Sequence, residues 1–158
     1  MIPVRIGVIG AGAFGRKHIE IMQKEPSCVL AAIADPVSEA AAYAGQLGVP
    51  YFAEYSRRFE EEGLDGVIIA TPNALHVPIG RACAARDIAI LIEKPIGETV
   101  AAARGLTKAA EHAGIALLVG HHRRHNPIIE KAREIVQGGS IGRITGVVGL
   151  WLLRKPDD

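Results

Sequence analysis

The sequence predicts an α/β domain built on a doubly wound parallel sheet, and three observations lead to this prediction. Apolar runs of strand length alternate with segments of helical periodicity along most of the 158 residues. A glycine-rich turn, Gly10–Gly15, follows the first apolar run almost at the start of the chain. The run Val67–Ala70 has no polar alternation, which is typical of a strand buried on both faces of a parallel sheet.

The elements follow one another in a regular order. The expected strands lie near residues 3–9, 28–34, 49–52, 67–70, 88–92 and 115–119, and the expected helices near 13–23, 40–47, 75–85, 99–112 and 128–136. Thr99 is expected to cap its helix, and Gly114 is expected to end it. A β-prone apolar segment over 144–153 follows the last helix. It has no obvious partner strand, so it would be a liability if it stayed unpaired.

The composition narrows the function classes. Hydrophobic residues make up 49% of the chain and aromatic residues 4%, which suits an α/β core of small aliphatic side chains. The formal net charge of +1 gives no strong field toward nucleic acid or membrane surfaces. Two cysteines form no disulfide framework, and no apolar run approaches the ~20 residues that cross a bilayer. With no signal peptide pattern ahead of the first strand, we expect a cytoplasmic protein.

A histidine-rich segment, Gly120–Pro127, contains the one basic cluster of the sequence. No Cys, Asp or Glu accompanies its histidines, and adjacent histidines do not easily share one metal ion. We therefore predict that no metal binds there. Because the net charge is small and this basic cluster is short, we also predict that neither nucleic acid nor a membrane is a partner.

The turn Gly10–Gly15 has the spacing G-x-G-x-x-G, which is typical of turns that bind the diphosphate of a dinucleotide. Gly10 would let the chain turn off the strand, Gly12 would let the backbone approach a phosphate, and Gly15 would let the next helix pack closely. The free N–H groups of that helix would face the phosphates. For the motif alone, a glycine-rich turn that binds nothing stays an open alternative.

Asp35 lies about 20 residues after Gly15, at the end of the second apolar run. At this place an acidic side chain accepts hydrogen bonds from the ribose hydroxyls of a dinucleotide. Its charge would repel a 2′-phosphate, and the neighbouring Pro36 and Val37 supply no cation to hold one. The sequence therefore predicts NAD as the cofactor rather than NADP.

Polar residues follow the buried strand Val67–Ala70. In a doubly wound sheet, ligands bind beyond the carboxyl ends of the strands, so Thr71, Asn73 and His76 are expected over the crevice. The alternative is ordinary turn chemistry, in which Thr71 and Pro72 end the strand and Asn73 caps the next helix.

Glu93, Lys94 and Pro95 follow the expected strand over 88–92. A lysine at a strand end beside a nicotinamide can donate or accept a proton, and Pro95 could follow a cis bond that fixes the direction of Lys94. The alternative is an exposed Glu-Lys pair in a turn, which is the usual place of such a dipeptide.

Together these residues resemble the Gfo/Idh/MocA family of oxidoreductases, which includes glucose-fructose oxidoreductase and inositol dehydrogenase-like enzymes. The resemblance rests on Val8–Gly15, Ala34–Pro36, Asp65–Asn73 with His76, Glu93–Pro95, and Val119–Gly120 leading to Arg123, Arg124 and Pro127. It implies a Rossmann fold. It also implies hydride transfer between NAD, or less readily NADP, and a hydroxyl of a small sugar- or polyol-like substrate.

The resemblance assigns roles to single residues. It implies that Lys94 is the catalytic lysine and that Glu93 and Asn73 lie near the nicotinamide ribose. With the glycine turn and the strand ends, the expected cofactor-binding residues are Gly10, Gly12, Ala13, Phe14, Gly15, Asp35, Thr71, Pro72, Asn73, His76, Glu93 and Lys94.

The resemblance also implies a second domain with a mostly antiparallel sheet, which holds the substrate and carries an Asp and a His of the catalytic group. Residues 1–122 would be the dinucleotide-binding domain, and residues 123–158 a stub of that second α+β domain. Three interpretations stay open. The chain is a truncated dehydrogenase, inactive alone, or a non-catalytic dinucleotide-binding module that acts as redox sensor or scaffold. In the third, two copies form a homo-oligomer by pairing their segments over 144–153.

Overall fold

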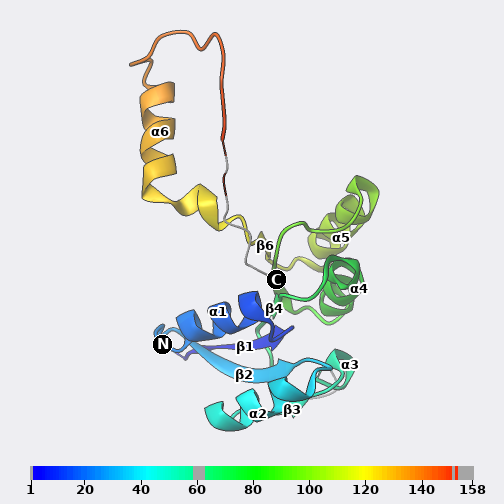
Figure 1. Ribbon diagram of the computed structural model, residues 1–158. Helices are drawn as coiled ribbons and strands as arrows, with labels where there is room; N and C mark the ends of the chain where they lie inside the picture. Colours follow the sequence, from blue (N-terminus) through cyan, green and yellow to red (C-terminus); the bar gives the residue numbers. More distant parts are fainter. Residues whose placement is uncertain (1, 59–62, 151, 153–158) are drawn as a thin grey trace. The chain divides into compact units, whose positions relative to one another are not determined.

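The computed structural model describes residues 2–58, 63–150 and 152, and the chain divides into two compact units between Gly120 and His121. The first unit alternates strands and helices along its length (Figure 1). Its elements are β1 (Val4–Ile9), α1 (Ala13–Met22), β2 (Cys28–Ala34), α2 (Ser38–Leu47), β3 (Tyr51–Phe52), α3 (Tyr55–Arg58), β4 (Gly66–Ile69), α4 (Asn73–Ala84), β5 (Ala89–Ile92), α5 (Val100–Ala113) and β6 (Leu117–Val119).

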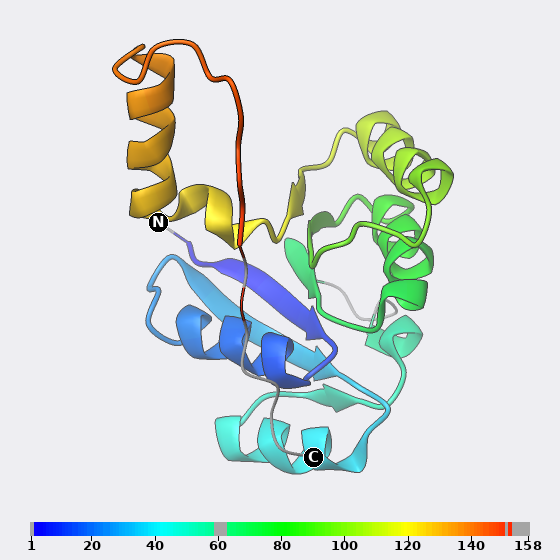
Figure 2. The same cartoon turned by 45° about the horizontal axis from the view of Figure 1, so that its top comes forward.

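The six strands form one sheet in the order β3-β2-β1-β4-β5-β6. All five neighbouring pairs are parallel, and the arrowheads of β1, β2 and β3 point the same way in Figure 2. The strand order reverses between β1 and β4, because β1 pairs with β2 on one side and β4 on the other. This confirms the predicted doubly wound fold and places a switch point at the carboxyl ends of β1 and β4.

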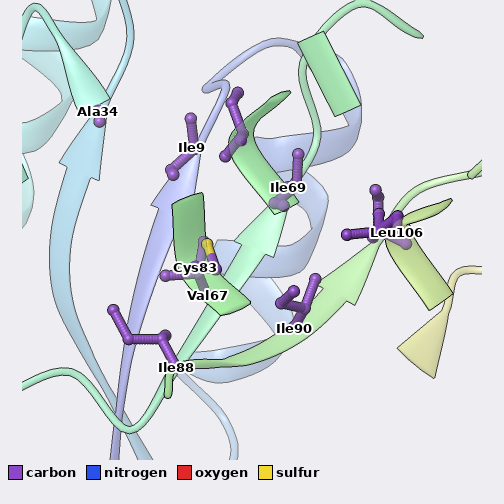
Figure 3. Packing of buried hydrophobic residues seen from close by; sticks show 10 residues of the cluster. Ile9, Ala34, Val67, Ile69, Cys83, Ile88, Ile90 and Leu106 are labelled. Atoms are coloured by element: carbon purple, nitrogen blue, oxygen red, sulfur yellow. The ribbon is translucent and has the colours of Figure 1, made fainter. Parts of the chain in front are cut away.

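Helices cover both faces of the sheet. Neighbouring residues of a strand point to opposite faces, so the strands contribute side chains to two separate clusters. Val67 and Ile69 of β4 belong to one buried cluster with Cys83 of α4 and Leu106 of α5, and Figure 3 draws its residues. Ile68 instead belongs to the cluster on the other face, where α1 and α2 contribute Ile19, Met22, Ala40 and Ala44. The uninterrupted apolar run of β4 is therefore the consequence of burial on both sides.

Most boundaries of the elements lie within two residues of their predicted positions. The predicted cap is confirmed, because the Thr99 hydroxyl accepts a hydrogen bond from the N–H of Ala102 at 3.1 Å. Gly114 follows α5 in the left-handed conformation, at φ 67°. Helix α3 has no counterpart among the predicted elements, since four residues carry too little periodicity to be recognised.

The second unit begins with a 3₁₀ helix over His122–His125 and continues with helix α6, Pro127–Gln137. Asn126 caps α6 by accepting a hydrogen bond from the N–H of Ile128 at 2.9 Å. The predicted strand over 144–153 does not form in residues 144–150 and 152, while its other two positions lie outside the described residues. A β-prone sequence makes a strand when an edge is available for pairing, and no strand pairs with the described part of this segment.

Candidate functional site

The glycine turn joins β1 to α1 at the switch point of the sheet. Gly10 has a φ of +91°, and a Cβ added to it would lie 2.6 Å from the carbonyl oxygen of Ala70. A Cβ on Gly15 would collide with the carbonyl oxygen of Gly10. Gly12 differs from both, because a Cβ there would meet nothing within 4 Å. The outer glycines are therefore required by the fold, whereas Gly12 borders open space in front of the first turn of α1.

The carboxylate of Asp35 holds the backbone of this turn and that of the turn after β2. One oxygen accepts a hydrogen bond from the N–H of Ala11 at 2.6 Å, and the other accepts one from the N–H of Val37 at 2.8 Å. The main chain of Asp35 is fixed as well, since its carbonyl accepts a hydrogen bond from the hydroxyl of Tyr51 at 2.8 Å. Asp35 thus links the first and second turns at the carboxyl edge, where each of its oxygens can accept a further hydrogen bond.

A hollow of about 540 Å³ lies at this edge. Residues from the ends of β1, β2 and β4 and from α3 and α4 line it: Ile9, Gly10, Gly12, Ala34, Asp35, Pro36, Val37, Ala53, Glu54, Tyr55, Ser56, Ala70, Thr71, Pro72, Leu75 and Ile79. Its wall is mostly apolar with a few polar groups, which is the usual composition of a small-molecule site. Among the described residues, the Thr71 hydroxyl oxygen is buried and has no hydrogen-bond partner.

A second hollow of about 300 Å³ lies beside the glycine turn and shares Gly12, Asp35 and Val37 with the first. Arg16 lines it, donating a hydrogen bond from Nε to the carbonyl of Ala11 at 3.0 Å. Its guanidinium carbon lies 4.6 Å from the ring centroid of Tyr43. The peptide between Ala11 and Gly12 is therefore held at its oxygen, while Asp35 holds the N–H of Ala11.

His76 is almost fully buried, at 1% exposure, beneath the loops that follow β4 and β5. Its Nδ1 lies 2.7 Å from the carbonyl oxygen of Pro95, and its Nε2 lies 2.9 Å from the carbonyl oxygen of Thr71. The ring therefore ties the turn after β4 to the turn after β5. The Lys94–Pro95 bond between these contacts is cis.

Glu93 and Lys94 follow β5 and approach one face of α1. Glu93 is buried, and its Oε1 lies 2.9 Å from Nε2 of His18. Lys94 is exposed, and its ammonium lies 5.7 Å from the centroid of the Phe14 ring. That distance is within the range of a cation–π contact. Phe14 and His18 are one helical turn apart, so a single face of α1 receives both side chains.

The structure distributes the predicted site residues over three groups. Gly10, Gly12, Asp35, Thr71 and Pro72 line the first hollow, and Ala13 lines the second with Gly12 and Asp35. Phe14, Glu93 and Lys94 lie together at the face of α1.

Three predicted residues lie apart from these groups. Gly15 and His76 are buried behind the loops, and Asn73 is exposed as the first residue of α4. The interpretation of Asn73 as the cap of α4 is wrong, because Pro72 occupies the N-cap position and no side chain caps the helix there.

Sequence reasoning missed two residues of this region, Arg16 and His18. Both lie on α1 within one turn of Gly15, on a helix already expected to face the ligand. The signal that could have found them is helical spacing, because positions i and i+4 share a face: Gly12 with Arg16, and Phe14 with His18.

The residues that the structure describes contain neither a metal-binding cluster nor a membrane-spanning helix. No group of three or more His, Cys, Asp or Glu that could hold a metal ion occurs in that part of the chain. Its helices are also each too short or too polar to cross a lipid bilayer.

This chain is similar to known oxidoreductases with an NAD-binding domain. Residues 4–121 match the family described as "Oxidoreductase family, NAD-binding Rossmann fold". The rhizopine catabolism protein MocA of Rhizobium meliloti is 32% identical over 144 residues, which are 91% of this chain and 45% of that protein. A D-xylose 1-dehydrogenase (NADP(+)) of Haloferax volcanii is 30% identical over 153 residues, 96% of this chain and 47% of its own length.

A solved structure has the same arrangement. The WlbA dehydrogenase of Bordetella pertussis, crystallised with NADH and UDP-GlcNAcA, superposes with a TM-score of 0.85 at 26% identity. The match covers 90% of this chain and 44% of that one. The chain therefore spans less than half of the length of these relatives.

Proposed function

The chain belongs to the Gfo/Idh/MocA oxidoreductase family, and from this premise we propose that it is the cofactor-binding part of an NAD-dependent dehydrogenase. The proposed reaction moves a hydride between the nicotinamide ring and a hydroxyl-bearing carbon of a sugar- or polyol-like substrate. The family match, the D-xylose dehydrogenase and the nucleotide-sugar complex of WlbA support this substrate class.

One observation carries the proposal. Gly12 faces open space in front of the N-terminus of α1, with Asp35 on one side and Lys94 following the nearby strand β5. The free N–H groups of α1 suit a diphosphate, and Asp35 suits the adenosine ribose. The apolar wall of the first hollow suits an adenine ring. The residues at this edge therefore fit a dinucleotide.

The residues of the chain would then have separate roles in binding the cofactor and in proton transfer. Bound nicotinamide supplies the hydride acceptor or donor. Lys94 Nζ would take the proton of the substrate hydroxyl when the carbon is oxidised and return it in the reverse direction. Asp35 and the glycine turn would fix the adenosine end. His76 would hold the two loops together so that Lys94 faces the ring.

The preference for NAD over NADP is part of the same proposal. Asp35 and Glu39 both line the second hollow, so a 2′-phosphate would meet two carboxylates there. Arg16 lines the same hollow and supplies one cation, which the sequence interpretation had not considered. Because two negative charges oppose one positive charge, we infer that NADH binds more tightly than NADPH.

The test begins with the chain itself, titrated with NADH and with NADPH by fluorescence and calorimetry. We expect binding of both, tighter for NADH, and we expect Lys94→Ala to keep the ability to bind NADH. In an enzyme of the relatives' full length that contains this domain, Lys94→Ala should lower turnover by about 100-fold or more, the contribution of a general base. Failure to bind either dinucleotide would overturn the assignment of the site, and undiminished turnover would overturn the role of Lys94.

A further inference from the structure

The carboxylate of Glu93 is largely buried, although the next residue in the sequence, Lys94, is exposed to solvent. Its side chain is 12% exposed, and Oε1 lies 2.9 Å from Nε2 of His18. An ionised carboxylate only accepts hydrogen bonds, so pairing with it requires a proton on Nε2 of His18. The other oxygen accepts a long hydrogen bond, 3.3 Å, from the backbone N–H of Lys94.

Gly120 closes the remaining side. A Cβ on Gly120 would lie 2.8 Å from Oε1 of Glu93 and 2.9 Å from Oε2, so the carboxylate packs directly on the backbone there. The backbone is fixed at this point, since the N–H of Gly120 donates to the carbonyl of Ile92 at 2.8 Å. Each oxygen of Glu93 therefore has one polar partner, and neither partner is the lysine ammonium.

The Lys94 ammonium takes a different partner on the same helix face. It lies over the ring of Phe14, four residues before His18 on α1. Both side chains are described, and no ion pair joins the Glu93 carboxylate to the Lys94 ammonium. Phe14 and His18 are one helical turn apart, so their Cβ atoms are roughly 5–6 Å from each other. Because Glu93 and Lys94 are neighbours in the sequence and contact this same helix face, a carboxylate released from His18 would have the Lys94 ammonium as its nearby cation.

We propose that His18 is a positioning residue that holds the Glu93 carboxylate and thereby keeps the Lys94 amine from being captured as an ion pair. The catalytic meaning of this arrangement rests on the proposed function, in which Lys94 Nζ carries a proton. An amine paired with the adjacent carboxylate would stay protonated and could not accept that proton. His18 itself would touch neither cofactor nor substrate.

The proposal is tested on the chain itself, without cofactor or substrate, by measuring how fast each lysine is acetylated by trace acetic anhydride, with the sites quantified by mass spectrometry. In His18→Leu, released Glu93 pairs with Lys94, so acetylation of Lys94 should slow by about threefold or more. His18→Gln keeps an N–H donor at the position of Nε2 and should retain the original rate. In the double variant with Glu93→Gln, the rate should return to that of the unchanged protein.

Lys108 of α5 serves as the internal standard, and His112→Leu in the same helix serves as the matched control for losing a histidine. A folded His18→Leu variant with an unchanged Lys94 rate would overturn the proposal. If that variant does not fold, Glu93→Gln alone tests whether Glu93 leaves the Lys94 amine unpaired. The acetylation rate of Lys94 in Glu93→Gln should stay within about twofold of the original, whereas a clear acceleration would mean that Glu93 already pairs with Lys94. Turnover of Lys94→Ala tests the proposed function separately, so the two failures are distinguishable.

Discussion

The three glycines of the first turn obey different physical constraints. Gly10 adopts a φ of +91°, a conformation that side chains with a Cβ rarely take, and Gly15 packs on the carbonyl of Gly10. Gly12 has an ordinary φ of −69° and open space around it. Nothing in the folded chain therefore requires a glycine at position 12, and the requirement at that position would come from a ligand.

Substitution by alanine separates these cases. Gly12→Ala should leave the free energy of unfolding within about 0.5 kcal/mol of the original, yet weaken NADH binding by about tenfold or more because the methyl group projects toward the diphosphate. Gly10→Ala should lower the free energy of unfolding by about 2 kcal/mol or more. Urea denaturation and NADH titration measure the two effects.

The control for this pair is Gly45→Ala in α2, where a Cβ also meets nothing within 4 Å. It should stabilise the chain by up to about 1 kcal/mol and leave NADH binding unchanged, because alanine favours a helix. Normal NADH binding by Gly12→Ala would contradict the placement of the diphosphate.

For single residues, the sequence predicted which strand end a residue follows more reliably than the direction in which its side chain points. Spacing from the glycine turn was enough to find Asp35, because the fold fixes where the second strand ends. His76 was expected over the crevice, but its ring is buried and lies between two carbonyl oxygens. Whether a residue after a strand points outward or beneath the loops depends on the neighbouring loop, and that loop is remote in sequence. Arg16 and His18 differ, because local helical spacing from Gly12 and Phe14 places both on faces of α1 that border the site.

Helix α4 shows how burial on an element changes the chemistry of a side chain. Cys83 lies on its inner face, fully buried against β4 and α5, and burial raises the pKa of its thiol from 9.0 to about 12. Arg86 opposes this shift, but desolvation is the larger cause. Cys28, at the start of β2, is half-buried. The two thiols should therefore differ in reactivity, with iodoacetamide modifying Cys28 and sparing Cys83 in the folded chain.

The raised pKa of Cys83 also predicts a dependence of stability on pH. Between pH 9 and about 12 the thiol ionises in the unfolded chain but stays protonated in the folded one, so the free energy of unfolding falls as pH rises through this window. The loss approaches about 1.4 kcal/mol per pH unit and is absent below pH 9. Urea denaturation at several pH values should show a flatter dependence in Cys83→Ala. Equal slopes would mean that the thiol ionises alike in both states.

Element order and face assignment followed from the sequence, whereas pairing at the end of the chain did not. The runs before Gly10 and Asp35 became central strands because helices cover both of their faces. The segment over 144–150 has comparable β propensity, yet it forms no strand in the structure. A strand is a property of a pair, and propensity alone cannot supply the partner.

At the scale of the whole molecule, the two units differ in kind. The first has a sheet with a core on each face, and every hollow and side chain assigned to the site belongs to it. In the second, every described residue from His121 onward is exposed. Several large apolar side chains there are more than four-fifths exposed: Val147, Val148, Leu150 and Leu152. Such a stretch favours self-association.

Removing residues 121–158 tests this division. The cut after Gly120 keeps the hydrogen bond from its N–H to Ile92, so β6 stays paired with β5. We expect the free energy of unfolding to change by less than about 1 kcal/mol and NADH affinity by less than about threefold, because no buried side chain is lost. Sedimentation velocity should show less self-association than in the full chain. A control cut after Gly114 removes β6, and with it the cover of Ile90 and Ile92, so it should destabilise the sheet strongly. Loss of NADH binding after the first cut would instead show that the second unit contributes to the cofactor site.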